Sequence, residues 1–303
     1  MNKSIFGGYH PLVNFLYFGY AILVPVFFVQ PVYLALSFAS ALAYSVYLNH
    51  GKSARFGYGL AILLMAVSAI MNPVFNHRGV TILTYLPDGN PLTLESVLYG
   101  VCMALMIGGV ILWFMSYNAI MTSDKFIYLF GRIIPAMSLI ISMALRFIPH
   151  YRAQIRRIAS ARRGIGFDAS SGGFFSRVRC GGEILSVMVT WALENGIETS
   201  DSMQARGYGL PGRTAYSNYR FDSRDKTLLC VFAVLMAASL TAIISGAASV
   251  QYFPMLIAGT VYPYAQISYA CHAAACLLPL ALEVREDILW RTLLGKVTTN
   301  ESV

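Results

Sequence analysis

The chain has 303 residues, of which 57% are apolar and only 12% are charged, with a mean hydropathy of +0.60. Soluble domains average about 45–50% apolar and about 25% charged residues, so this composition excludes an ordinary soluble protein and predicts several membrane spans. The net charge of +8 does not indicate a nucleic-acid-binding protein, because the basic residues lie between and beside the apolar segments, where membrane orientation accounts for them.

Four apolar segments precede the most basic part of the chain. They cover residues 12–29, 31–48, 59–75 and 97–117, and each approaches the length of about 20 residues that a helix needs to cross a bilayer. Lys3 precedes the first segment, Lys52 and Arg55 lie between the second and third, and Lys125 follows the fourth. The 76–95 loop has a charge near neutral, since its Arg78 is accompanied by Asp88 and Glu95. By the positive-inside rule, their positions predict a cytoplasmic N-terminus and an outer loop at 76–95.

Residues 126–148 are also apolar, but a further crossing here would carry the arginines that follow to the outer side. Arg132 and Pro135 interrupt this run. We therefore expect a bent helix that lies along the inner interface or under the bundle, and that leads into the basic region on the cytoplasmic side.

Two helical patterns make up the basic region. The first carries an apolar stripe, Ile148, Tyr151, Ile155 and Ile158, and is predicted to stop at Gly164 and Gly166. The second runs from about Glu183 to Arg206, is predicted to bury Ile184, Val187, Met188 and Trp191, and is ended by Gly207, Gly209 and Pro211.

Two more apolar runs, 227–247 and 265–283, predict a crossing out and back, with a cytoplasmic C-terminus. The predicted fold is therefore an all-α polytopic protein of the cell membrane with about six transmembrane helices and long cytoplasmic helices inserted before the last two. The expected divisions are residues 1–125 with the first four spans, 126–225 on the cytoplasmic side, and 226–303 with the last spans and the tail.

Few residues offer chemistry of their own, and no cofactor is predicted. Cys271, His272 and Cys276 form the one Cys/His cluster, for which core packing is favoured over metal binding. Glu194, Glu198 and Asp201 share a helix face, which is read as solvated rather than as a cation site. The glycines at 207, 209 and 212 do not join a strand to a helix, so a dinucleotide site is not indicated. Because the sequence contains no G-x-x-x-x-G-K-[ST], any ATP energy is expected to come from another subunit.

Arg163 and Arg206 each stand at a predicted helix C-terminus, next to a glycine. The helix dipole stabilises a cation there without any partner, and anionic lipid headgroups would attract it as well. The repeated combination of an arginine with small residues favours a third interpretation, in which the arginine enters a narrow groove and pairs with a carboxylate.

The segment Trp191 to Gly209, which contains Ala205-Arg206-Gly207, resembles the second Ala-Arg-Gly signature of the transmembrane T components of energy-coupling factor (ECF) transporters, a family that includes the membrane subunits of cobalt and nickel importers. Residues 72–81 and 142–149 are also similar to segments of that family. The first signature is matched by Ala161-Arg162-Arg163-Gly164, in which Arg162 stands where the family has alanine.

The resemblance implies that the two signatures end coupling helices, each docked on one of two ABC ATPase subunits through its arginine. It also implies a substrate-binding S component held by the membrane part, and uptake of a vitamin, metal ion or other micronutrient. The expected docking residues are Ala161, Arg162, Arg163, Gly164, Ala205, Arg206 and Gly207, with either Arg162 or Arg163 making the first contact. The alternatives are a stand-alone secondary transporter or S-type substrate binder, and a lipid-modifying membrane enzyme.

Overall fold

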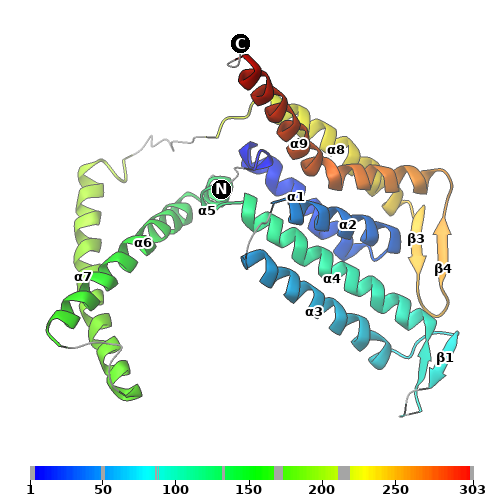
Figure 1. The fold of residues 1–303 in the computed structure, drawn as a ribbon, viewed down its shortest axis with the longest axis horizontal. Helices are drawn as coiled ribbons and strands as arrows, with labels where there is room; N and C mark the ends of the chain where they lie inside the picture. Colours follow the sequence, from blue (N-terminus) through cyan, green and yellow to red (C-terminus); the bar gives the residue numbers. More distant parts are fainter. Residues whose placement is uncertain are drawn as a thin grey trace. The chain divides into compact units, whose positions relative to one another are not determined.

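Helices dominate the computed structural model, which describes residues 4–48, 52–85, 87, 89–131, 134–166, 173–210 and 219–300 (Figure 1). A short 3-10 turn, Phe6–Gly8, precedes α1. The α-helices are α1 (Pro11–Phe27), α2 (Pro31–Leu48), α3 (Lys52–Phe75), α4 (Leu94–Ile120), α5 (Ser123–Gly131), α6 (Pro135–Gly164), α7 (Phe174–Ala205), α8 (Ser223–Ile244) and α9 (Tyr264–Asn300). Two antiparallel hairpins complete the fold, β1 (Ile82–Tyr85) with β2 (Pro91–Thr93) and β3 (Ala248–Gln251) with β4 (Ile257–Thr260).

Each predicted span falls on one helix of the structure. Among the described residues, α2, α3, α4, α8 and α9 are long and apolar enough to cross a membrane, whereas α1 is apolar but has only 17 residues. The prediction of an all-α polytopic membrane protein is confirmed, with five such helices and a shorter sixth one.

Local signals in the sequence fix where several of these helices begin. Thr93 accepts a hydrogen bond from the Ser96 backbone N–H and caps α4. At α8, Asp222 and Asp225 form a capping box, in which each side chain bonds the backbone of the other. Pro135 begins α6, and its lack of an N–H costs nothing there, because the first N–H groups of a helix have no partner within the helix.

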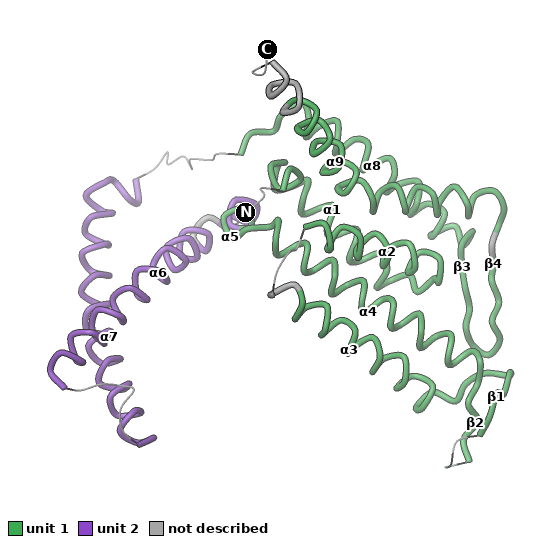
Figure 2. The backbone as a smooth tube through the Cα atoms, in the orientation of Figure 1, with its two compact units in different colours: residues 1–126, 219–303 green, residues 127–218 purple. Residues whose placement is uncertain are grey.

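The chain divides into two compact units, shown in Figure 2. Unit 1 comprises residues 1–126 and 219–303, and unit 2 comprises residues 127–218. Within unit 1, α3 packs on α4, α4 packs on α2, and α2 packs on α9, which pairs with α8. Helix α1 lies against α4 and α8.

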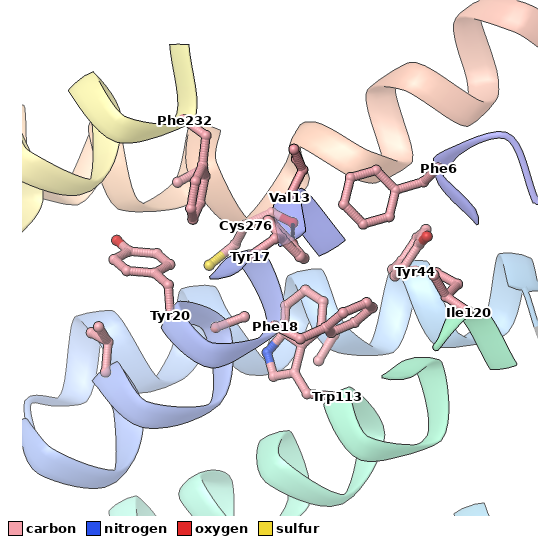
Figure 3. Close-up of a cluster of buried hydrophobic side chains, with 14 of the residues drawn as sticks. Phe6, Val13, Tyr17, Phe18, Tyr20, Tyr44, Trp113, Ile120, Phe232 and Cys276 are labelled. Carbon is pink, nitrogen blue, oxygen red and sulfur yellow. Dashed lines mark hydrogen bonds between the residues drawn. The ribbon is translucent and has the colours of Figure 1, made fainter. Parts of the chain in front are cut away.

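The largest core of unit 1 is an aromatic cluster around Trp113 of α4 (Figure 3). Trp113 is fully buried, and its ring lies 5.8 Å from that of Tyr17 and 6.3 Å from those of Phe18 and Tyr44. Its indole N–H donates to Ser37 Oγ at 3.0 Å. The cluster therefore joins α1, α2 and α4 through one side chain whose polar atom is also satisfied.

Two buried charged side chains, Glu283 and Lys125, hold the start of the chain in place within unit 1. Glu283 accepts hydrogen bonds from the backbone N–H groups of Ile5 and Phe6, at 3.1 and 3.2 Å. Lys125 donates to the carbonyls of Gly7 and Ile120. These contacts hold Lys125, near the start of α5, against the other residues of unit 1.

The structure corrects three expectations about elements. The apolar stretch 126–148 is not one bent helix: α5 ends at Gly131, and α6 begins at Pro135 after the non-helical N-cap residue Ile134. Arg132, expected to interrupt the helix, lies outside the described residues. Helix α7 begins at Phe174 rather than near Glu183, because Gly181 and Gly182 are accommodated inside it. The loops after α3 and α8 contain β-hairpins, which the helical pattern did not predict.

Candidate functional site: two arginine-bearing helix ends

The first signature occupies the last turn of α6. Arg162 and Arg163 are helical, and so is Gly164, which is the last residue of the helix. The left-handed residue that stops the helix is Gly166, with a φ of +86°, whose N–H bonds the carbonyl of Arg163 at 3.0 Å. Of the two glycines expected to end this helix, Gly166 therefore supplies the unusual backbone conformation.

The second signature forms the C-terminal cap of α7. Arg206 is the C-cap residue, and Gly207 follows it with a φ of +84°. The Gly207 N–H bonds the Gln204 carbonyl at 2.9 Å and the Tyr208 N–H bonds the Met203 carbonyl at 3.0 Å, which is the pair of bonds of a Schellman motif. Arg206 thus stands at the point where the helix stops, and its side chain is exposed.

The two arginine-glycine pairs consequently differ in backbone role, and this difference predicts opposite effects of alanine. Gly207→Ala places a Cβ at positive φ, 3.1 Å from Leu210 Cδ1, which costs about 1–2 kcal/mol. Gly164→Ala, the matched control, adds a Cβ with no atom within 4 Å, in a helical residue. Hydrogen exchange of the amides at positions 207 and 208 is expected to speed up about 5- to 30-fold in Gly207→Ala. Equal protection of both helix ends in the two variants would contradict this assignment.

Helices α6 and α7 pack together within unit 2. The Trp191 ring of α7 lies 5.1 Å from His150 and 5.6 Å from Tyr151, both of α6. Among the described residues of α7, the buried ones are Cys180, Ile184 and Met188. Burial of Ile184 and Met188 is confirmed, but Val187 is 50% exposed, because it lies on a different face of the helix. Trp191, also predicted to be buried, is only partly buried.

An ion pair joins the first signature to α7. The Arg162 guanidinium donates to Glu183, whose other oxygen also accepts from Arg179 at 3.3 Å. The Arg162 side chain is 17% exposed, against 44% for Glu183 and 85% for Arg179. The hydrogen bond between Arg162 and Glu183 is the largest cause that lowers the pKa of the Glu183 carboxyl and raises that of the Arg162 guanidinium. Both groups are therefore charged at neutral pH.

The ion pair also sets the spacing of the two signatures. Arg162 meets α7 at Glu183, whereas Arg206 lies about 23 residues further along the same helix, which is about 35 Å at 1.5 Å per residue. The two arginine-bearing ends of the helical pair are thus well separated along α7.

Other predicted candidates do not come together as sites. Glu194, Glu198 and Asp201 are exposed on α7. His272 lies in the core of unit 1, where its Nδ1 shares a hydrogen bond with Tyr20 Oη at 2.8 Å and its Nε2 is 3.6 Å from Cys276 Sγ. In the part of the chain that the structure describes, no three His, Cys, Asp or Glu side chains are grouped as metal ligands. Pro211, predicted to help end α7, lies outside the described residues.

Glu183 was not predicted as a site residue, because the sequence pattern identified it only as the approximate start of a helix. One signal was present: it is the only acidic residue between Phe174 and Leu193, in a stretch that also carries Arg177 and Arg179. A single carboxylate near an arginine-rich partner helix is a candidate for an interhelical ion pair.

Comparison with known proteins relates this chain to one family. The family model CbiQ, described as cobalt transport protein, matches residues 8–216. The energy-coupling factor transporter transmembrane protein EcfT of Lactobacillus helveticus is 35% identical over 101 residues, 33% of this chain and 36% of that protein. The EcfT protein of Bacillus selenitireducens is 34% identical over 103 residues, 34% of this chain and 38% of that protein.

A longer match is to EcfT of Staphylococcus aureus, 24% identical over 191 residues, which cover 58% of this chain and 70% of that protein. The matches to the Lactobacillus and Bacillus proteins span little more than a third of those relatives' lengths. The family model, in contrast, covers more than half of the chain. The chain therefore belongs to the CbiQ family of cobalt transport proteins and is a transmembrane T component of the energy-coupling factor type.

Proposed function

We propose that this chain is the scaffold and coupling subunit of an ATP-driven importer, which transmits the motion of two ABC ATPase subunits to a substrate-binding S component for uptake of a vitamin, metal ion or other micronutrient. The observation that carries the proposal is the pair of exposed helix ends, with Arg163 in the last turn of α6 and Arg206 at the cap of α7. We assign both helix ends and the two chain termini to the cytoplasm from the distribution of basic residues.

The chemistry of docking follows from the exposed guanidinium groups. A guanidinium presents five N–H donors in a planar fork that matches a carboxylate bidentately, so each helix end suits an acidic groove on an ATPase subunit. Neighbouring small residues, Ala161 and Gly164 at the first end and Ala205 and Gly207 at the second, leave room for the groove walls. Because the ends are about 35 Å apart along α7, each receives its own subunit.

Force transmission then depends on the rigidity of α6 and α7. When ATP binding closes the two ATPase subunits, the docked ends move with them, and the packed helices carry this displacement to the membrane part. The S component, held against the membrane helices, changes orientation and releases its ligand to the inside. The T component itself needs neither a nucleotide site nor a substrate site for this role.

Purification of the complex tests this proposal. The tagged chain, extracted from its native membrane in mild detergent, is expected to bring down two nucleotide-binding subunits and one small membrane protein. The complex is expected to hydrolyse ATP, and the isolated chain is not. Recovery of the chain alone, with substrate transport retained in vesicles that contain no other protein, would instead identify a stand-alone secondary transporter.

A further inference from the structure

The first helix end carries two adjacent arginines, and the structure treats them differently. The Arg162 side chain is 17% exposed and is engaged by Glu183 of α7. Arg163 is exposed at the surface of unit 2. From the sequence alone, either arginine could make the docking contact. In the structure, the two side chains differ in exposure and in contacts, which distinguishes their roles.

Helix geometry directs the two arginines toward different sides of α6. Successive residues of an α-helix point about 100° apart, so a helix that directs Arg162 toward α7 directs Arg163 toward a different side. For Arg162 to dock on a partner, its guanidinium would first have to leave Glu183. Glu183 would then keep only Arg179, whose side chain is 85% exposed and whose contact is a solvent-screened pair within one helix.

Glu183 connects the first helix end to the helix that carries the second one. It lies on α7 beside the buried Cys180 and Ile184, in the part of the helix that packs on α6. Displacement of the α6 end is therefore passed to α7 near its packed region, and α7 leads without a break to Arg206.

We infer that Arg163 is the docking residue of the first helix end, and that Arg162 is a positioning residue that binds Glu183 and ties this end to α7. This inference rests on the proposed function, because it assigns roles within the same docking site. Its consequence is that the two docking ends move as one body rather than independently.

Exchanging the charges of the ion pair tests this assignment in the whole complex. Arg162→Glu alone and Glu183→Arg alone each place like charges at the α6–α7 contact, and both are expected to lower ATPase capture by the tagged chain. The double variant Arg162→Glu with Glu183→Arg restores opposite charges and is expected to bring capture back to within about twofold of the wild type. Arg163→Glu is expected to lower capture at least about tenfold, and adding Glu183→Arg does not rescue it.

Glu194→Gln is the matched control, because Glu194 is an exposed carboxylate on the same helix. A structural readout accompanies capture: hydrogen exchange of the amides at 160–166 is expected to speed up in each single variant at positions 162 and 183 and to recover in the charge-exchanged pair.

The outcomes separate this inference from the proposed function. If the charge-exchanged pair regains amide protection but still fails to capture the ATPases, while Arg206→Glu also fails, Arg162 is itself a docking residue and the inference is wrong. If capture is insensitive to glutamate at both 163 and 206, the proposed function is wrong. If Arg163→Glu alone leaves capture intact, the inference fails while a loss in Arg206→Glu preserves the proposed function.

Discussion

Arg206→Glu is expected to abolish ATPase capture and substrate uptake while leaving the chain folded in the membrane. Arg206 caps α7, is exposed, and makes no side-chain hydrogen bond or ion pair within the described part of the chain, so reversing its charge removes no internal contact. Facing carboxylates in a docking groove, the new glutamate replaces attraction by repulsion. Losing a close, desolvated charge pair costs about 2–5 kcal/mol, which is a weakening of about 30- to 5,000-fold.

Quantitative co-purification of the ATPase subunits with tagged variants measures this effect, with uptake by intact cells as the second readout. Arg152→Glu is the matched control, because Arg152 is also exposed, lies in the middle of α6, and changes the net charge by the same amount. Equal losses in the two variants would mean that overall positive charge, and hence attraction to anionic lipids, governs the behaviour rather than docking at the helix end.

Trp113→Ala is expected to cost about 3–5 kcal/mol of folding stability. The side chain is fully buried among the rings of Tyr17, Phe18 and Tyr44, so its removal leaves a cavity between α1, α2 and α4. Van der Waals contacts drive helix association inside a bilayer, where burial from water contributes little, and a cavity forfeits these contacts. The Ser37 hydroxyl also loses its indole partner.

Unfolding of the purified protein in mixed micelles with increasing SDS measures the change as a lower transition midpoint. The neighbouring residue provides the control: Phe114 is 47% exposed on the same helix, and Phe114→Ala is expected to shift the midpoint by less than about a third as much. If both substitutions destabilise the protein equally, the aromatic cluster is not the centre of unit 1.

The membrane helices were predictable from the sequence because bilayer thickness imposes both their length and their apolar character. The predicted span 31–48 and helix α2 coincide, and the predicted 97–117 lies inside α4. The C-terminal ends of α6 and α7 were equally predictable, because Gly166 and Gly207 stand where the backbone adopts the left-handed conformation.

What the sequence could not supply was pairing between distant residues. The Arg162–Glu183 contact depends on how α6 crosses α7, and helical periodicity contains no information about that crossing. The beginning of α7 was misplaced for a related reason: Gly181 and Gly182 suggest a helix boundary, but the packing of Cys180 and Ile184 carries the helix through them. Here tertiary packing overrides the low helix propensity of the two glycines.

The distribution of burial along α7 has a mechanical consequence. Every buried residue of this helix lies between Cys180 and Met188, so the stretch from Ala192 to Ala205, about 20 Å long, has no fully buried side chain to hold it in place. Side-chain burial adds little to its stiffness, and Gly196, beside which a Cβ would meet no atom within 4 Å, is the residue of this stretch with the lowest helix propensity. A force applied at Arg206 is therefore expected to bend α7 most readily at Gly196.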